Sequence, residues 1–302
     1  MMRPSMKPIQ SLLIGFPPAK LNLGLHLLGK RADGFHDLES VFLPLSGERG
    51  WTDVLELEVK ASRTERGAQL QVTGIEVPGS DEDNLVLKAW QLLDERSGGQ
   101  LPDVMFRLHK TIPTGAGLGG GSADGTFALR MLNEALRLDI EEDEMADLAA
   151  ALGSDCTFFI QDDPAHITGR GERLEAMMEV WDVLDGWHVA VVHPGLHIST
   201  REAFAGVASN GVMLDLREVV GAPVNEWAKL GMLNSFQTGV AARHPEIEEL
   251  LGWMAEGGAA FHALTGTGSA VFGLFDTTEG AQAIKERAVD RGWTGFSGPV
   301  GG

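Results

Sequence analysis

Residues 113–125 form a glycine-rich segment, Pro-Thr-Gly-Ala-Gly-Leu-Gly-Gly-Gly-Ser-Ala-Asp-Gly. Glycine has no Cβ atom, so a backbone rich in glycine can approach a ligand closely. A helix that begins directly after such a segment offers free N–H groups and the positive end of its dipole, and both bind phosphate. A flexible linker or a tight turn would need fewer glycines. The residues expected to hold a triphosphate are Gly115, Ala116, Gly117, Leu118, Gly119, Gly120, Gly121 and Ser122, with Ser122 capping the helix.

Two familiar phosphate-binding motifs do not occur in this sequence. There is no Gly-x-x-x-x-Gly-Lys-Ser/Thr, so the glycine-rich segment is not a P-loop. Nor does an early strand carry Gly-x-Gly-x-x-Gly followed by an acidic residue about twenty positions later, as a dinucleotide-binding fold would need.

Charged side chains that could take part in chemistry stand at two other places. From Lys20 onward, leucines alternate with Lys20, Asn22 and other residues, which predicts a half-buried strand with an ammonium and an amide on one face. Taken alone, Lys20 could equally be a solvated surface lysine. Asp155 lies between a predicted helix end and an apolar run expected to be a strand. Spacing alone favours a turn aspartate without a chemical role there.

Aromatic and basic residues could bind the bases of a nucleotide. Phe35 and His36 follow a glycine in a polar turn, where a ring could stack on a base and the imidazole could read its edge. Simple packing would explain the pair equally well. Lys110 stands three residues before the glycine-rich segment, in place for a phosphate or an adenine.

The predicted elements alternate between strands and helices and give no repeat. Helices are expected at residues 85–96 (capped by Asn84), 122–136, 141–152, 230–242, 245–257 and 278–292. Strands are expected at residues 11–14, from 20, at 38–45, 51–60, 103–108, 156–160 and 189–193. The strand at 51–60 is expected to form a hairpin with residues 69–74. The segment Gln161-Asp-Asp-Pro164 predicts a domain boundary, with one domain at residues 1–163 and the other at residues 164–302.

Composition restricts the class of protein. The formal net charge of -19 argues against a broad surface for nucleic acid or anionic membranes. Cys156 is the only cysteine, which excludes an intrachain disulfide and fits a reducing compartment. No apolar run approaches the roughly 20 residues of a membrane span. These features predict a cytoplasmic protein without a secretory leader.

Three stretches together resemble the signature motifs of the GHMP kinases, the superfamily of galactokinase, homoserine kinase, mevalonate kinase and phosphomevalonate kinase. They are Pro-Ala-Lys-Leu-Asn-Leu at 18–23, residues 113–123, and the second glycine-rich turn at 264–273. Within this superfamily, residues 18–23 and 30–36 resemble the kinases that act on a cytidine-diphosphate-linked methylerythritol in the non-mevalonate isoprenoid pathway. Residues 83–85, 153–155 and 193–195 are also similar to these kinases.

The resemblance implies a two-domain α+β fold, with a ribosomal-protein-S5-domain-2-like N-terminal half and a ferredoxin-like C-terminal half. It implies transfer of the γ-phosphoryl group of Mg²⁺-ATP to the C2 hydroxyl of the methylerythritol unit. By matching position, Asp155 would be the base and Lys20 would orient the hydroxyl. Ser122 would contact Mg²⁺ through water. The expected state is a monomer or a homodimer.

The resemblance also implies roles for residues around the two ligands. The residues expected to contact the substrate are Asn22, Phe35, His36 and Phe204, with Gly266, Thr267 and Gly268 closing the site. Phe35 would stack on cytosine, with Phe204 on the opposite face. Asn84 and Lys110 would border the adenine.

Some residues depart from the family pattern and leave other functions open. Asn234-Ser-Phe-Gln237 stands where the family usually has Asn-Asp-aromatic-Glu, and Phe35 stands where tyrosine is common. The alternatives are another GHMP kinase, acting on homoserine or a mevalonate derivative, and a non-catalytic ATP-binding sensor. The segment ending at His36 favours a cytosine-containing substrate. Retention of Lys20 and Asp155 argues against the sensor.

Overall fold

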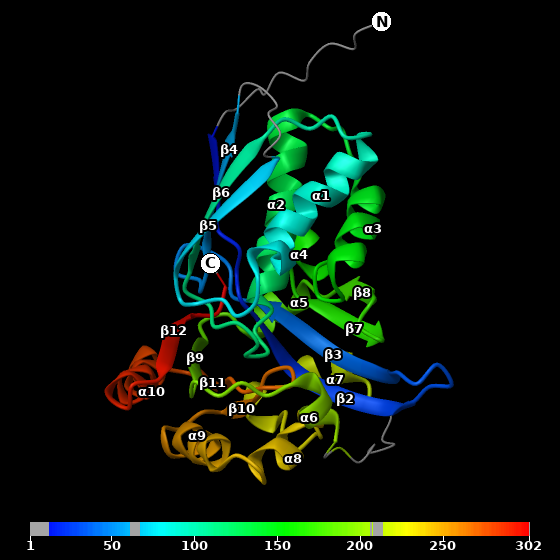
Figure 1. Cartoon of the computed structure of the whole chain (residues 1–302). Helices are drawn as coiled ribbons and strands as arrows, with labels where there is room; N and C mark the ends of the chain where they lie inside the picture. Colours follow the sequence, from blue (N-terminus) through cyan, green and yellow to red (C-terminus); the bar gives the residue numbers. More distant parts are fainter. Residues whose placement is uncertain (1–11, 61–66, 206, 208–213, 302) are drawn as a thin grey trace, which may run out of the picture. The chain divides into compact units, whose positions relative to one another are not determined.

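The computed structural model describes residues 12–60, 67–205, 207 and 214–301, and the chain divides into two compact units (Figure 1). The first unit consists of Met1–Pro18, Thr52–Ile112 and Gly120–Gln161. The second consists of Ala19–Trp51, Pro113–Gly119 and Asp162–Gly302. These units are not the two continuous segments, 1–163 and 164–302, that the sequence predicts as domains. Residues 19–51 join the second unit because their strands pair with strands that follow residue 164.

The first unit contains a four-stranded sheet in the order β1-β4-β6-β5. Its strands are β1 (Leu12–Gly15), β4 (Val54–Val59), β5 (Ala68–Gly74) and β6 (Val104–Lys110). The predicted hairpin between β4 and β5 is wrong, because β6 lies between them, antiparallel to β4 and parallel to β5. A parallel pair needs a crossover connection, and α1 supplies it between β5 and β6.

Helices of the first unit cover one face of this sheet (Figure 1). They are α1 (Leu85–Arg96), α2 (Gly120–Leu136), α3 (Glu142–Leu152) and α4 (Phe158–Gln161), with a short 3₁₀ helix η1 at Asp81–Asp83. Asn84 caps α1 as predicted, since its Oδ1 accepts the N–H of Val86 at 3.0 Å.

Two local predictions in the first unit are corrected. Helix α2 begins at Gly120, directly after Gly119 with its positive φ, so Ser122 lies in the first turn instead of capping the helix. The run at 156–160, predicted as a strand, consists of turn residues and the start of α4. It packs Phe158 and Phe159 into the unit instead of pairing with the sheet.

The second unit contains two four-stranded antiparallel sheets, ordered β2-β3-β7-β8 and β10-β11-β9-β12. The strands are β2 (Lys20–Lys30), β3 (His36–Pro44), β7 (Ala165–Gly169), β8 (Arg173–Ala176), β9 (His188–His193), β10 (Phe261–Leu264), β11 (Val271–Phe275) and β12 (Thr294–Pro299). The helices are α5 (Glu179–Val183), α6 (Thr200–Phe204), α7 (Leu216–Val220), η2 (Val224–Glu226), α8 (Gln237–Ala241), α9 (Pro245–Glu256) and α10 (Thr278–Asp290).

The predicted helix at 230–242 is largely absent, and only α8 forms. The backbone before α8 pairs instead with β2: Leu25 N–H donates to Leu233 O and Ser235 N–H donates to Leu25 O. A backbone engaged with a strand in this way cannot also make the hydrogen bonds of a helix.

Strand β2 is buried on both faces over its first eight residues, so the prediction of a half-buried strand is wrong. Leu25 and Leu27 belong to a core shared with β9, β11, α9 and α10. The polar residues of the opposite face, including Lys20, are also buried. Alternation in sequence identified the strand correctly, but it could not show that protein covers the polar face.

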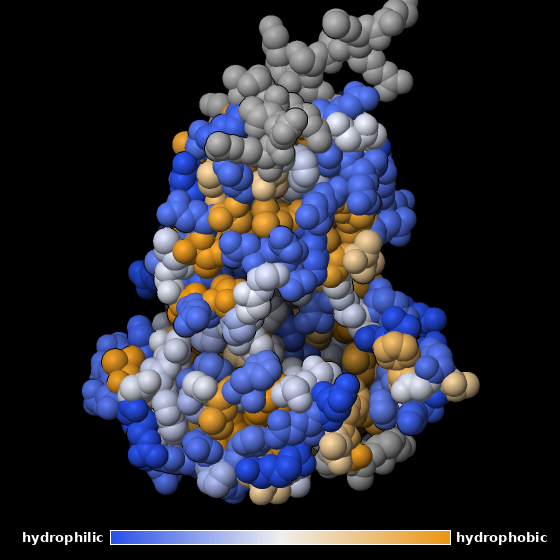
Figure 2. Space-filling model, in the orientation of Figure 1, coloured by the Kyte–Doolittle hydropathy of each residue, from blue (hydrophilic) through white to orange (hydrophobic). Residues whose placement is uncertain are grey.

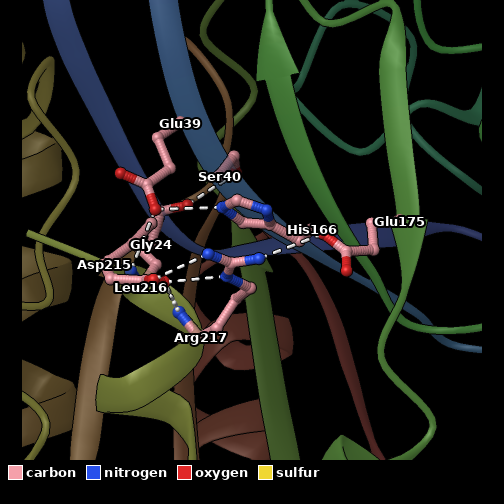
Figure 3. A network of polar contacts seen from close by, with 8 residues as sticks. All are labelled: Gly24, Glu39, Ser40, His166, Glu175, Asp215, Leu216 and Arg217. Atoms are coloured by element: carbon pink, nitrogen blue, oxygen red, sulfur yellow. Dashed lines mark hydrogen bonds and ion pairs between the residues drawn. The ribbon is translucent and has the colours of Figure 1, made fainter.

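A polar network attaches α7 to the first sheet of the second unit (Figure 3). The carboxylate of Glu39 on β3 accepts hydrogen bonds from His166 Nε2 and from the N–H of Leu216, both at 2.9 Å. Asp215 caps α7 by accepting the N–H of Arg217 at 3.0 Å, and it also pairs with the Arg217 guanidinium. Buried Glu39 therefore fixes the beginning of α7 on β3 and β7.

Hydrophilic residues dominate the face shown in Figure 2, where hydrophobic groups form separate patches. Within the described part of the chain, every helix is too short or too polar to cross a membrane.

Candidate active site

Lys20 lies at the beginning of β2 and is almost completely buried, with 3% of its surface exposed. Its ammonium donates to Asn22 Oδ1 at 2.7 Å and lies 4.5 Å from the centre of the Phe42 ring. Its backbone N–H donates to Leu118 O at 2.8 Å, which attaches β2 to the glycine-rich segment. Lys20 is therefore not the solvated surface lysine that the sequence left open.

Asn22 connects Lys20 with the second glycine-rich turn. Its Oδ1 also accepts the N–H of Gly266 at 2.9 Å, and its own backbone N–H donates to Thr265 Oγ1 at 3.1 Å. On the other side, its Nδ2 donates to Ser40 Oγ at 2.9 Å. The structure thus brings three of the predicted site residues, Lys20, Asn22 and Gly266, into one hydrogen-bonded cluster.

The turn at 264–269 is held by residues to which sequence reasoning gave no role in the site. Asn234 Nδ2 donates to Leu264 O at 2.7 Å and to Gly266 O at 2.8 Å. Gln237 Oε1 accepts the N–H of Leu264 at 2.9 Å. Both residues belong to Asn234-Ser-Phe-Gln237, the segment that corresponds to a family motif, and this correspondence is the signal that could have found them. Thr267 and Gly268 lie in the same turn, and Gly268 has a φ of 88°.

The glycine-rich segment is divided between the two units. Gly115, Gly117 and Gly119 in the second unit all have positive φ, which favours glycine. A Cβ at Gly117 would lie 2.1 Å from the carbonyl oxygen of Thr265, so close approach to the second turn also requires glycine there. Ala116 and Leu118 between them are buried.

The remaining residues of the segment, Gly120, Gly121 and Ser122, form the first turn of α2 in the first unit. The N–H groups in the first turn of an α-helix have no carbonyl partner within the helix. A Cβ at Gly121 would meet nothing within 4 Å, whereas one at Gly120 would collide with Ile112. The exposed side of this turn at Gly121 is therefore open to a ligand.

Asp155 is half-buried in the turn between α3 and α4 of the first unit. Next to it, burial raises the pKa of the Cys156 thiol to about 11, although hydrogen bonds with Ser122 and Thr126 act in the opposite direction and the charge of Asp155 adds to the increase. Thr126 Oγ1 also donates to Cys156 O at 2.8 Å. Cys156 thus brings the start of α2, with Ser122, next to the turn that carries Asp155.

Lys110 occupies a different environment from the predicted one. Its ammonium is bound between the carboxylates of Asp53 and Asp124, and 2% of its side chain is exposed. A phosphate cannot reach this ammonium without moving it, so only the backbone of Lys110 is available to border an adenine.

A pocket of about 210 Å³ in the first unit is lined by ten residues that include Asn84, the predicted neighbour of adenine. The others extend from Val72 at the end of β5 to Asp81 in η1. A larger pocket of about 730 Å³ lies in the second unit, between Trp181, Trp187 and Gly301. None of the predicted site residues lines this larger pocket.

The predicted aromatic residues lie in two groups. Phe35 is 53% exposed, and the Arg170 guanidinium lies 4.2 Å from the centre of its ring. The ring of Phe204 lies 4.9 Å from that of His36 and 4.9 Å from that of Phe236. Phe204 therefore contacts His36, whereas the guanidinium of Arg170 lies over one face of the Phe35 ring.

Within the described residues, one group has the composition and spacing to bind a metal ion: Glu39, His166 and Asp215. In Figure 3 each of them is already engaged, Glu39 by His166 and Leu216 and Asp215 by Arg217. The hydrogen bond from Arg217 lowers the pKa of Asp215 to about 2. These contacts support a structural role for the group.

Comparison with known proteins gives matches over most of the chain. Residues 84–165 match the GHMP kinases N terminal domain, and residues 220–292 match the GHMP kinases C terminal domain. The chain is 39% identical over 264 residues to the 4-diphosphocytidyl-2-C-methyl-D-erythritol kinase of Bacteroides thetaiotaomicron, covering 87% of this chain and 92% of that relative. It is 41% identical over 265 residues to the enzyme of the same name from Parabacteroides distasonis, with the same coverage.

Solved structures of kinases also resemble this chain. A crystal structure of 4-(cytidine 5'-diphospho)-2C-methyl-D-erythritol kinase superposes with a TM-score of 0.77 at 29% identity, over 96% of this chain and 100% of that chain. A homoserine kinase from Cytophaga hutchinsonii superposes with a TM-score of 0.68 at 15% identity, over 99% and 97% of the two chains, which is a likeness of fold alone.

Proposed function

Since the chain belongs to the 4-diphosphocytidyl-2-C-methyl-D-erythritol kinase family within the GHMP kinases, we propose that it transfers the γ-phosphoryl group of ATP to the C2 hydroxyl of that substrate. The predicted α+β GHMP kinase fold is confirmed. The observation that carries the proposal is identity near 40% over almost nine tenths of the chain to kinases of this name. The reaction is a step of isoprenoid biosynthesis.

Phosphoryl transfer depends mainly on alignment and on neutralising the negative charge of the phosphates. The first turn of α2 supplies N–H donors and the positive end of a helix dipole, which supports phosphate binding at Gly120–Ser122. Mg²⁺, when bound with ATP, would neutralise charge on the phosphate oxygens, and the Ser122 hydroxyl would contact it through water. The open space at Gly121 fits a ligand of this kind.

Asp155 would accept the proton of the attacking hydroxyl, and Lys20 would orient that hydroxyl. The buried position of Lys20 supports this role, because Asn22 and the Phe42 ring hold its ammonium in one place. A fixed cation stabilises a developing alkoxide better than a mobile one, since no reorganisation is needed during the reaction. Asp155 is followed by Cys156, whose thiol is hydrogen-bonded to Ser122 at the start of α2. This contact supports a position of Asp155 beside the phosphates.

Phe35 would stack on the cytosine ring with its free face, since Arg170 occupies the other. His36 would read the edge of the base, and Phe204 would support His36 from behind instead of closing over the cytosine. Asn84 would border the adenine in the pocket of the first unit. We further propose that the enzyme works in the cytoplasm as a monomer or a homodimer.

The test is ADP release by the purified protein with Mg²⁺-ATP and each of three alcohols: 4-diphosphocytidyl-2-C-methyl-D-erythritol, homoserine and mevalonate. We expect turnover with the cytidylated substrate alone. Turnover with homoserine or mevalonate instead would support a kinase activity but contradict the proposed binding of cytosine by Phe35 and His36. Clear ATP binding without turnover of any alcohol would favour a sensor.

A further inference from the structure

Three charged side chains form a buried triad directly behind the first turn of α2. This turn, Gly120–Ser122, is the one proposed above to bind phosphate and is called the phosphate-binding turn below. The ammonium of Lys110, the last residue of β6, contacts the carboxylate of Asp53 and lies 2.8 Å from Asp124 Oδ2. Side-chain exposure in the triad is 3% or less for each member. Lys110 is the cation shared by the two carboxylates, so the position of each member of the triad depends on the others.

The triad contacts the beginning of α2 from its inner side. Asp124 itself is the fifth residue of α2, and a Cβ at Gly120 would lie 3.3 Å from the Lys110 ammonium nitrogen. The first turn of the helix therefore lies directly over the triad. A shift of Lys110 or Asp124 would move the N–H groups of this turn.

The triad also fixes the chain that leads into the glycine-rich segment. Asp53 Oδ1 accepts the N–H groups of Thr111 at 2.6 Å and Ile112 at 2.9 Å. Ile112 in turn packs under Gly120. The same three side chains thus hold both the residues before the segment and the helix after it, all within the first unit.

We propose that Asp53, Lys110 and Asp124 position the first turn of α2 for the phosphates of ATP, with Asp124 as a positioning residue that does not itself contact the nucleotide. This inference rests on the proposed kinase function. It gives Lys110 a task behind the phosphate-binding turn instead of a direct contact with phosphate.

The experiment measures KM for ATP and for the alcohol substrate in three variants. Asp124→Ala removes the carboxylate, and Asp124→Asn keeps an oxygen acceptor for Lys110 but removes the charge. Leu132→Ala is the control, because Leu132 is fully buried in the same helix and away from the triad. Fluorescent-ATP titration and thermal unfolding are measured on all proteins.

We expect Asp124→Ala to raise KM for ATP at least about tenfold and Asp124→Asn to raise it severalfold, because small misplacements at a phosphate site weaken binding strongly. KM for the alcohol should stay within about twofold in both. Leu132→Ala should lower the melting temperature but leave KM for ATP within about twofold. If Asp124→Ala does not fold, the Asp124→Asn result decides.

Wild-type KM for ATP in the folded Asp124 variants would overturn the positioning role while the kinase function stands. An equal increase in Leu132→Ala would also overturn it, since general destabilisation would then explain the effect. A wild-type protein that fails to bind the fluorescent nucleotide would overturn the proposed function and this inference with it.

Discussion

Asn22 uses both ends of its amide group. Its oxygen accepts from the Lys20 ammonium and from the N–H of Gly266, while its nitrogen donates to Ser40. An aspartate would lack the donor for Ser40, and an aliphatic residue would leave the buried Lys20 ammonium without this acceptor. The residue type at position 22 therefore follows from the need to hold a cation while satisfying a hydroxyl on the neighbouring strand.

Asp155→Asn tests the proposed base. The substitution keeps the size of the side chain but removes its ability to accept a proton, so we expect kcat to fall by about 10²–10⁴ while ATP binding is retained. Steady-state kinetics and fluorescent-ATP titration measure the two effects separately. Asp147→Asn, on the exposed face of α3, is the control and should match the wild type. A kcat close to wild type in Asp155→Asn would remove Asp155 from this role.

Side chains at the start of α8 and just before it hold the backbones of β2 and β10. Ser235 Oγ accepts the N–H of Leu27 at 3.0 Å, and Gln237 Oε1 accepts the N–H of Leu264 at 2.9 Å. These are the two positions at which the family pattern has carboxylates. Because both replacements offer an oxygen acceptor, the backbone donors of β2 and β10 keep their partners without a negative charge.

Gln237→Ala would leave the buried N–H of Leu264 unpaired, and we expect it to lower the free energy of unfolding by about 1–3 kcal/mol. Gln237→Glu should stay closer to the wild type, because it restores an oxygen acceptor at this position. Urea unfolding of both variants measures the effect, with Thr238→Ala on the exposed side of α8 as the control. Equal stability of Gln237→Ala and Thr238→Ala would show that this hydrogen bond does not hold the turn.

Elements with strong local signals could be predicted from the sequence. Asn84 identified the start of α1, and the alternating leucines identified β2. The burial of Lys20 could not be predicted, because its partners Asn22 and Phe42 come together only when β2 pairs with β3. Local periodicity does not encode which residues face one another across paired strands.

The same limit applies to the candidate site. Residue type and spacing predict the glycine-rich segment as a phosphate site, the family resemblance implies the roles of Lys20 and Asn22, and sequence proximity alone places Lys110 near a phosphate. Asp53 is 57 residues from Lys110 in the sequence, so the ion pair that removes Lys110 from solvent had no local signal. Asp155 was recognised through family resemblance, since its turn carries no periodic pattern.

At the scale of the whole molecule, the chain passes between its two compact units five times. Two of these passages enclose residues 113–119, so the glycine-rich segment begins in one unit and continues as α2 in the other. The two units are therefore not separable by a single cut near residue 163. The residues proposed to bind phosphate therefore belong partly to each unit.

Global stability should depend on pH through the buried triad. Burial raises the pKa of Asp124 to about 7, although the Lys110 ammonium acts in the opposite direction, and the Asp53 carboxylate adds to the increase. Burial also disfavours the Lys110 ammonium, but Asp124 and Asp53 together raise its pKa, so it stays charged. The groups that face Asp124 are Lys110 and Asp53, while α1 contributes apolar Leu85 next to the neighbouring Gly125.

A carboxyl group with a raised pKa binds its proton more tightly in the folded state than in the unfolded state. Its contribution to stability is complete below the unfolded pKa near 4 and is lost as the pH rises through about 7. We expect the wild type to lose stability relative to Asp124→Asn between pH 5 and 8, on the order of 1 kcal/mol per pH unit below pH 7. Urea unfolding of both proteins at several pH values measures this difference. A difference that stays constant from pH 5 to 8 would mean that Asp124 is ionised throughout this range, and the triad would then carry a net negative charge behind the turn proposed to bind phosphate.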